Sequence, residues 1–494
     1  MNKNSNSNKD ISAIHLRTQA LILIEFPWGR DKDPRVPLGH ASLLTKLKSE
    51  NNINIYSVVS EVNSTDFNIK SIFHEIINII NDNQAIPIDI AMGVYVWSED
   101  IIQKLLPKIR IKGFIGRIIL GGPQISYSGP GLEEFYPDAD VFIRGYGENA
   151  LCSLLKNNNK KRIPGVHYAG EQDIVQQATA NLELLPSPWL NDMIEIKEQT
   201  FIRWETQRGC PFRCSFCQHK EAGARLKSRQ FSACRIRDEI DLFCSNNVLD
   251  IAVLDPIFNA SPMAILILKR FIEKKYRGRL SLQCRAEMIT DEFIELASEL
   301  DVCLEFGLQT IHDNEGTAIE RRNNIPKVDK VLNKINHRNI EYEVSLIFGL
   351  PEQTLESFYD TISWCLKRSV PVIKAFPLML LRGTGIDKER KKWNLSESGG
   401  SMPVVLSSNT FNYNEWCKMA QISMALSSTE GKYVLTLLFH SAFDNTFPLG
   451  SIKALEKVPI FLLNPSKGNF ISKLMLNEFI VLFHLLMPTE ESLI

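Results

Sequence analysis

Three of the ten cysteines in this 494-residue chain fall within eight residues. They are Cys210, Cys214 and Cys217, spaced as C-x3-C-x2-C. A closed structural zinc site takes four ligands and usually draws them from two separated pairs, but the sequence contains no second C-x2-C pair. Three thiolates from one short loop instead suit an iron–sulfur cluster. The loop therefore predicts a 4Fe-4S cluster with one iron left open for a small molecule.

Two simpler interpretations of this cysteine loop remain open. It could be a zinc loop completed by a distant cysteine or by a histidine such as His219, or its cysteines could be unconnected core residues. In a reducing compartment, clustered cysteines are more often metal ligands than disulfides. The remaining cysteines are scattered among apolar neighbours, which is typical of small buried side chains. They are Cys152, Cys234, Cys244, Cys284, Cys303, Cys365 and Cys417.

An aromatic residue, Phe216, stands directly before the third cysteine. With this residue the loop resembles that of the radical S-adenosylmethionine (SAM) superfamily. The resemblance implies that Cys210, Cys214 and Cys217 bind the cluster and that Phe216 lies beside the adenine of SAM. It also implies that the open iron chelates the amino and carboxylate groups of SAM, and that an electron from the cluster cleaves a carbon–sulfur bond to release a carbon radical.

The region around and after the loop alternates between apolar runs and helical spacing, which predicts parallel strands with helices between them. Expected strands are 201–207, 250–254, 280–284, 302–307, 342–348 and 372–376. Expected helices are 228–245, 263–275, 290–299, 327–336 and 354–368. Six such units predict a partial (βα)6 barrel, the TIM-like fold of radical SAM enzymes. Because the cysteine loop follows the first strand, we expect the cluster at the barrel mouth, where the strands end.

Two further strand ends agree with this resemblance. Asp255 lies in a D-x-x-F segment that passes near the SAM amino group in related enzymes, although it could also cap a helix. Arg285 directs a cation at the barrel top and could hold a carboxylate of SAM or substrate. A salt bridge from Arg285 to Glu287 or Glu305 is an equally good alternative.

The later strands carry the remaining family segments. Gln309 has a donor and an acceptor for the ribose and methionine parts of SAM. Arg321 or Arg322 stands where an arginine often meets the SAM carboxylate. Gly349 and Pro351 belong to a G-L-P-E-Q-T turn expected against the adenine, in which the second glycine of the family pattern is missing. Each segment is weak alone, but their order and spacing behind the cysteine loop make a strong signal.

The first third of the chain predicts a doubly wound, Rossmann-like α/β domain with its ligand at the carboxyl ends of the strands. Expected strands are 20–26, 53–59, 88–94, 117–120 and 140–143, and expected helices include 38–48 and 69–81. No G-x-G-x-x-G follows the first strand and no phosphate-binding loop is present, so we expect neither a nicotinamide nor a nucleoside triphosphate site.

The glycine turns of this region resemble the cobalamin-binding domain that precedes many radical SAM domains. The resemblance spans residues 18–190, and it implies that cobalamin binds near Gly121, Gly122, Gly145 and Gly147. Two features depart from the family. Tyr146 replaces the usual acidic residue of the last turn, and no D-x-H-x-x-G motif supplies a histidine to cobalt. The domain could therefore also have kept its fold and lost its cofactor.

These patterns divide the chain into four expected parts. They are a disordered tail (1–17), a cobalamin-binding-like domain (18–190), a radical SAM core barrel (195–390) and a mostly helical C-terminal cap (396–494). In the cap, 413–427 and 473–487 have helical spacing. The second could lie on a membrane surface or pack on a partner, but we expect a docked core helix.

Composition excludes several classes of partner. The formal net charge of −1 gives no electrostatic reason to expect binding to nucleic acid or to an anionic membrane. No apolar run reaches the ~18 residues of a transmembrane helix, and the polar N-terminus lacks the apolar core of a signal peptide. We therefore expect a cytoplasmic protein without an integral membrane segment.

The expected activity is reductive SAM cleavage, followed by methyl transfer from cobalamin to an unactivated carbon of a small molecule or natural-product intermediate. An external donor such as flavodoxin or ferredoxin would supply the electron. Cyclisation, ring contraction and aminocarboxypropyl transfer are alternative outcomes, and a non-catalytic sensor or a zinc-stabilised module are alternative classes. An RNA methylthiotransferase is disfavoured because it usually has three extra N-terminal cysteines and a basic RNA-binding end. No motif names the substrate.

Overall fold

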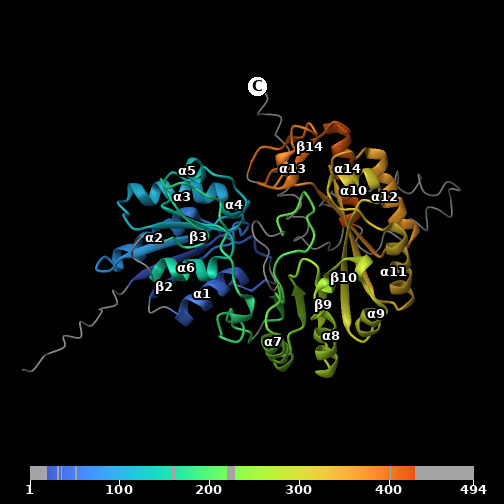
Figure 1. Ribbon diagram of the computed structural model, residues 1–494, viewed down its shortest axis with the longest axis horizontal. Helices are drawn as coiled ribbons and strands as arrows, with labels where there is room; N and C mark the ends of the chain where they lie inside the picture. Colours follow the sequence, from blue (N-terminus) through green and yellow to red (C-terminus); the bar gives the residue numbers. More distant parts are fainter. Residues whose placement is uncertain are drawn as a thin grey trace, which may run out of the picture.

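The computed structural model describes residues 19–428, apart from 31–32, 35, 51–52, 157–161, 198, 220–228 and 401. The described chain forms two α/β lobes, each built around a six-stranded sheet (Figure 1). We call the part around β1 to β6 the first lobe and the part around β7 to β12 the second lobe. No described helix is long and apolar enough to cross a membrane.

The first lobe has the sheet order β2-β1-β3-β4-β5-β6. Its strands are β1 (Ala20–Glu25), β2 (Asn54–Val59), β3 (Ile88–Gly93), β4 (Ile118–Gly121), β5 (Val141–Ile143) and β6 (Val166–Tyr168). The first five are parallel, and β6 pairs antiparallel with β5. The direction of winding reverses between β1 and β3, which is the position where open α/β sheets bind ligands.

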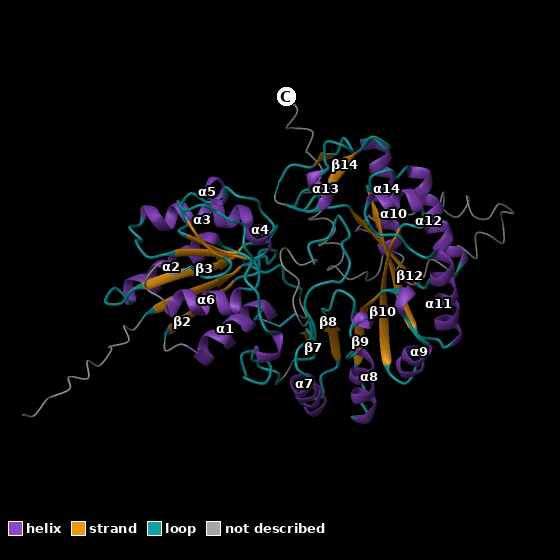
Figure 2. Ribbon diagram, viewed as in Figure 1, coloured by secondary structure: helices purple, strands orange, loops and turns teal. Residues whose placement is uncertain are grey.

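Helices cover both faces of this sheet, as Figure 2 shows. They are α1 (Leu38–Glu50), α2 (Ile69–Asp82), α3 (Glu99–Ile111), α4 (Pro123–Ser126), α5 (Leu132–Phe135) and α6 (Gly147–Lys156). Ile22 and Ile24 of β1 pack in one core with α2 and α3, whereas Leu21 and Leu23 pack in another with α1 and α6. Because successive side chains of a strand point to opposite faces, β1 is apolar throughout.

The second lobe has the order β12-β11-β10-β9-β8-β7, with every neighbouring pair parallel. Its strands are β7 (Phe201–Trp204), β8 (Asp250–Val253), β9 (Arg279–Cys284), β10 (Asp301–Gln309), β11 (Glu341–Phe348) and β12 (Val372–Pro377). The helices after them are α7 (Ala233–Ser245), α8 (Ala264–Glu273), α9 (Asp291–Ala297), α10 (Asp313–Ala318), α11 (Ile325–His337) and α12 (Leu355–Lys367). Each strand lies beside the previous one in sequence, so the predicted partial (βα)6 barrel is present.

The segment after β12 contains α13 (Gly385–Lys388), a short hairpin of β13 (Ser396–Glu397) and β14 (Val405–Ser407), and α14 (Tyr413–Ser428). The last helix contacts β11 and β12, so the expected helix 413–427 is present and docked on the barrel. The hairpin was not expected in a mostly helical cap. The expected tail 1–17 and helix 473–487 lie outside the described residues.

The turn after β11 shows why the family pattern has a glycine at the position occupied here by Glu352. Glu352 has a φ of 65°, in the left-handed region that L side chains disfavour by ~1–2 kcal/mol. We therefore expect Glu352→Gly to raise the free energy of unfolding by about 0.5 kcal/mol, measured by urea denaturation. Glu356→Gly is the matched control: it should lower stability, because Glu356 lies inside α12. A loss of stability in Glu352→Gly would contradict the argument.

Candidate active site

The three cysteines of the loop lie after β7, at the carboxyl end of the second sheet, and each sulfur has a hydrogen-bond donor. The backbone N–H of Phe212 donates to Cys210, and that of His219 donates to Cys217 Sγ at 3.3 Å. Arg321 Nη1 lies 3.7 Å from Cys214 Sγ. Donors around a sulfur stabilise a thiolate. The arrangement suits thiolate ligands, although burial raises the pKa of the Cys210 and Cys217 thiols in the protein without metal.

The described residues contain no group of three His, Cys, Asp or Glu side chains placed to hold a single metal ion. An iron–sulfur cluster does not require such convergence, because its thiolates bind different iron atoms. His219 contacts Cys217 through its backbone N–H.

Polar atoms beside the loop fit a polar ligand. Arg321 Nη2 donates to the Gly307 carbonyl, and Gln309 ends β10 with a φ of 68°. Arg321 Nε, Gln309 Oε1 and Ser215 Oγ are buried and have no hydrogen-bond partner among the described residues. A buried polar atom without a partner costs about 1–3 kcal/mol, so a ligand that satisfies these atoms would be favoured here. Arg321 and Gln309 were predicted from the sequence, whereas Ser215 was not.

Asp255 is fully buried and fixes the start of the cysteine loop. Its carboxylate accepts from the backbone N–H groups of Thr206 at 2.8 Å and Gln207 at 3.1 Å, and from the Thr206 hydroxyl. Burial raises the pKa of Asp255 to about 7 against these hydrogen bonds. The alternative that Asp255 caps a helix is wrong, because Ile257 and Met263 occupy the N-cap positions of the two helices that follow it. Its expected place near the SAM amino group remains a prediction.

Arg285 forms the salt bridge to Glu287 that was the alternative to a ligand role. Its Nε lies 3.3 Å from Glu287 Oε2, and its Nη2 donates to the Arg322 carbonyl at 2.8 Å. The guanidinium also lies 4.1 Å from the ring centroid of Phe212, inside the cysteine loop. Arg285 thus supports the loop by packing against Phe212.

The other predicted SAM contacts are spread around the barrel mouth. Phe216 is half-buried against the core of the second lobe. Gly349 and Pro351 form the turn after β11, where the Gly349 N–H donates to Gln353 Oε1 at 2.7 Å. Arg321 and Arg322 border a hollow of about 530 Å³ lined by residues 310–313 and 321–326.

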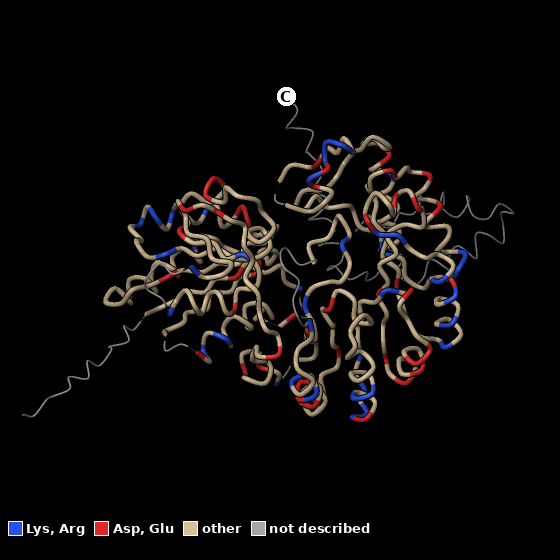
Figure 3. The backbone as a smooth tube through the Cα atoms, in the orientation of Figure 1, with Lys and Arg blue, Asp and Glu red and all other residues tan. Residues whose placement is uncertain are grey.

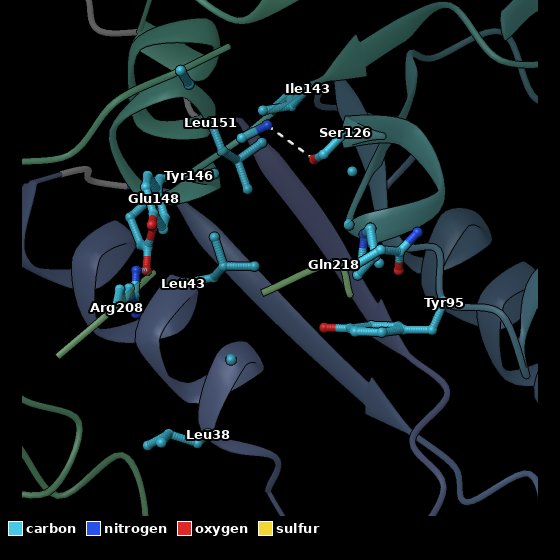
Figure 4. A pocket seen from close by; sticks show the side chains of 18 of the residues that line it. Leu38, Leu43, Tyr95, Ser126, Ile143, Tyr146, Glu148, Leu151, Arg208 and Gln218 are labelled. Carbon is cyan, nitrogen blue, oxygen red and sulfur yellow. Dashed lines mark hydrogen bonds and ion pairs between the residues drawn. The ribbon is translucent and has the colours of Figure 1, made fainter. Parts of the chain in front are cut away.

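A cavity of about 690 Å³, which we call the interlobe cavity, lies between the carboxyl edge of the first sheet and the cysteine loop. The first lobe contributes all four predicted glycines, Gly121, Gly122, Gly145 and Gly147. The second lobe contributes residues of and beside the loop: Glu205, Gln207, Arg208, Gly209, Gln218, His219, Leu254, Pro256 and Gln283. Figure 4 shows apolar side chains such as Leu43 and Leu151 beside a few polar ones.

Two of the glycines are required by the backbone itself. A Cβ at Gly122, whose φ is 92°, would lie 2.8 Å from the backbone of Val94, and one at Gly145 would lie 2.5 Å from the Ala178 carbonyl. Gly121 has room, because the nearest atom to an added Cβ is 3.6 Å away. The cavity therefore depends on close backbone packing at its rim, which the sequence alone did not distinguish from ligand contact.

Glu25 and Tyr95 form a buried pair at the switch point of the first sheet that sequence reasoning missed. Glu25 ends β1 and Tyr95 follows β3, and both line the cavity. Burial raises the pKa of Glu25 from its usual 4.5 to about 8, although the Tyr95 hydroxyl donates to it. Trp97 stacks on Tyr95 at 4.9 Å. The available signal was a carboxyl at the end of an otherwise apolar strand.

This pair predicts a pH-dependent stability. Because Glu25 binds its proton more tightly in the folded state, its contribution is full below about pH 4.5 and is lost as pH rises towards 8. As pH rises across this window, the native protein should lose stability relative to Glu25→Gln, which has no proton to release. The difference between their free energies of unfolding should change by up to about 1 kcal/mol per pH unit, measured by urea denaturation. Glu75→Gln, an exposed change on α2, should show no such trend. Parallel pH profiles for Glu25→Gln and native protein would contradict the argument.

An ion cluster that also escaped prediction joins the two lobes. Arg208 Nη1 donates to Glu148 Oε1 of α6 at 2.6 Å, and its Nε donates to Glu205 Oε2 at 2.9 Å. Burial alone would raise the pKa of Glu148, but Arg208 holds it below the usual value. The ring of Tyr146 lies 5.6 Å from the Arg208 guanidinium. Tyr146, which replaces the acidic residue of related domains, thus serves this cluster as an aromatic partner.

Comparisons with known proteins agree with this arrangement. Residues 204–365 match the model of the radical SAM superfamily. The cobalamin-dependent radical SAM methyltransferase TokK of Streptomyces tokunonensis is 26% identical over 304 residues, covering 56% of this chain and 44% of that protein. The 2-(S-pantetheinyl)-carbapenam-3-carboxylate methyltransferase of Streptantibioticus cattleyicolor is 26% identical over 307 residues, with the same coverages. The match therefore spans less than half the length of these curated relatives.

Solved structures share the fold of both lobes. The radical SAM methyltransferase TsrM of Kitasatospora setae, solved with cobalamin and a [4Fe-4S] cluster, has a TM-score of 0.61 at 17% identity and 81% coverage of both chains. The cobalamin-dependent radical enzyme OxsB, solved with aqua-cobalamin, has a TM-score of 0.64 at 16% identity, covering 95% of this chain and 76% of that one. The predicted fold class is confirmed. This chain carries a radical SAM domain and has the two-lobed fold of the cobalamin-dependent radical SAM enzymes.

Proposed function

We propose that this protein is a radical SAM methyltransferase that binds a 4Fe-4S cluster at Cys210, Cys214 and Cys217 and cobalamin in the interlobe cavity. The observation that carries the proposal is that one cavity joins the glycine-lined edge of the first sheet to the cysteine loop. When bound, the cluster supplies an electron for SAM cleavage and cobalamin supplies a methyl group. The substrate is a small molecule with an unactivated carbon.

The residues beside the loop have the chemistry to hold SAM. Arg321 is fixed by the Gly307 carbonyl, and its Nε, which has no partner in the described part of the chain, can donate to a carboxylate. Gln309 Oε1 can accept from a ribose hydroxyl or from the amino group. Asp255 and Arg285 hold the loop in place, through Thr206 and Phe212 respectively, so the thiolates are presented from a rigid backbone.

The interlobe cavity has the chemistry to hold a corrinoid. Its walls combine apolar side chains with glycines that keep the rim open, and a buried carboxyl–phenol pair lies at the switch point. TsrM and OxsB have been solved with cobalamin bound, and TokK is a cobalamin-dependent methyltransferase, which supports the same assignment here.

The proposed partners are a small-molecule substrate and an external electron donor such as flavodoxin or ferredoxin. TsrM has been solved with a tryptophan substrate, which shows that this fold accommodates a small molecule. Figure 3 shows basic and acidic residues interspersed over both lobes. Together with the net charge of −1, this gives no electrostatic support for a nucleic acid partner.

The test is to reconstitute the protein anaerobically with iron and sulfide, load it with hydroxocobalamin, add SAM and a low-potential reductant, and analyse the products by mass spectrometry. We expect 5′-deoxyadenosine from reductive cleavage. We also expect S-adenosylhomocysteine only when cobalamin is loaded, because SAM then loses its methyl group to the cofactor. Intact SAM under reducing conditions would refute the proposal, and zinc in place of iron would favour a structural module.

A further inference from the structure

The cysteine loop is held by the first lobe at its starting end. Arg208 lies two residues before Cys210, and its side chain is only 12% exposed. It donates to Glu148 at 2.6 Å, and Glu148 also accepts from the Ser42 hydroxyl at 2.9 Å. Glu148 and Ser42 both belong to the first lobe, so this buried ion pair ties one end of the loop to that lobe.

The other end of the loop is held in a similar way. Gln218 directly follows Cys217, and its backbone carbonyl accepts from the Tyr127 hydroxyl of the first lobe. Its side-chain Nε2 donates to the Arg382 carbonyl at 2.8 Å. The Arg382 guanidinium in turn donates to both carboxylate oxygens of Glu99, at 2.8 and 3.1 Å. Gln218 is therefore held twice, and each contact leads to the first lobe.

Residues 381–386, which we call the strap, fill the space between the first lobe and the loop. A Cβ at Gly383 would lie 1.9 Å from the Tyr127 carbonyl, so the two backbones are in direct contact. The Ile386 N–H donates to the Ser215 carbonyl at 3.0 Å, between the second and third cysteines. Small movements of the first lobe must consequently reach the loop through close packing.

The residues that hold the loop also line the interlobe cavity. Tyr127 and Glu148 do so from the first lobe, and Arg208 and Gln218 do so from the loop. Figure 4 shows Glu148 and Arg208 meeting at one side of the cavity, with Gln218 at the other side. A ligand that fills the cavity therefore contacts the same residues that set the position of the cysteines.

We propose that Arg208, Gln218 and Tyr127 are positioning residues that couple the interlobe cavity to the cysteine loop, so that corrinoid binding and cluster binding strengthen each other. The inference rests on the proposed cofactors. By linkage, a cluster that orders the loop must raise corrinoid affinity by the same factor by which the corrinoid raises cluster affinity.

The experiment is to titrate hydroxocobalamin into the full-length protein with and without its cluster, following bound corrinoid by visible absorbance. In the native protein we expect a Kd at least about fivefold lower when the cluster is present. In Tyr127→Phe this ratio should fall close to one, while the Kd of the cluster-free form changes little. Phenylalanine keeps the ring and removes the hydroxyl that donates to the Gln218 carbonyl, so a general loss of structure would not produce this pattern.

The matched control is Tyr56→Phe. Tyr56 lies on the edge strand β2, and the substitution removes a hydroxyl that donates to Asn83 at 2.8 Å. It should keep the native ratio. Gln218→Met tests the second connection, because it removes the side-chain hydrogen bond to the Arg382 carbonyl. It should also lower the ratio, which keeps the test valid if Tyr127→Phe folds poorly. Equal Kd values for the two native forms, or a native ratio in both variants, would overturn the coupling alone. If neither native form binds hydroxocobalamin, both the coupling and the proposed cofactor are overturned.

Discussion

Replacing Cys214 by serine is expected to lower the rate of reductive SAM cleavage by about 10³-fold or more. Cys214 is the most buried of the three loop cysteines, and its sulfur lies 3.7 Å from Arg321 Nη1. A serine hydroxyl keeps the size of the side chain but does not supply the thiolate that holds iron. The measurement is the rate of 5′-deoxyadenosine release after anaerobic reconstitution, together with the iron content of the protein.

Cys234→Ser is the matched control, because Cys234 is exposed at the start of α7. It should keep native iron content and native rate. Serine at Cys210 or Cys217 should behave like serine at Cys214. A native rate of SAM cleavage in any of the three loop variants would contradict the assignment of the cysteines.

Filling the interlobe cavity is expected to weaken corrinoid binding strongly and leave SAM cleavage in place. Gly121 ends β4 and lines the cavity, and an added Cβ finds no atom closer than 3.6 Å. Leucine at this position should therefore fit the strand and occupy ligand space. We expect Gly121→Leu to weaken hydroxocobalamin binding by about 100-fold, or about 2.7 kcal/mol, because overpacking and lost contacts act together. Equilibrium titration by visible absorbance measures this.

Gly129→Leu controls for the substitution itself, because a Cβ at Gly129 meets nothing within 4 Å and the residue does not line the cavity. It should bind hydroxocobalamin like the native protein. Gly121→Leu should still release 5′-deoxyadenosine, but it should no longer form S-adenosylhomocysteine. Native corrinoid affinity in Gly121→Leu would place the ligand elsewhere.

The two sheets were predictable because their signals are local. The apolar run Ala20–Glu25 is buried along its whole length, as in strands covered on both faces, whereas Glu341–Phe348 buries every second side chain. Segments with helical spacing separate such strands. The predicted helix 228–245 starts earlier than the observed one. The structure begins α7 at Ala233, because Ser232 is its N-cap and accepts from the Arg235 N–H. The strand β6 was missed because its three residues are too short to show a pattern.

The contacts between lobes were not predictable, because they join residues far apart in sequence. Arg208 and Glu148 are 60 residues apart, and Arg382 and Glu99 are 283 apart. A single charged residue in a sequence does not reveal its partner. The cysteine loop, by contrast, was visible from the spacing of its cysteines alone. The hydrogen-bond donors to its sulfur atoms could be identified only from the structure.

The structure also sorts the predicted ligand contacts by what they touch. Asp255 and Arg285 use their hydrogen bonds on the loop and on Glu287, whereas Gln309 and Arg321 each have a buried atom without a partner among the residues that the structure describes. Sequence patterns mark both kinds of residue equally, because residues that hold the loop and residues that contact a ligand both occur at strand ends. Only the three-dimensional count of donors and acceptors separates them.

The central claim, a cluster with one iron open to SAM, is tested most directly by electron paramagnetic resonance of the reduced, reconstituted protein with and without SAM. The account predicts the signal of a reduced 4Fe-4S cluster whose line shape changes on SAM addition, because the open iron gains a ligand. A cluster signal that SAM leaves unchanged, or a protein that takes up zinc and gives no such signal, would contradict it.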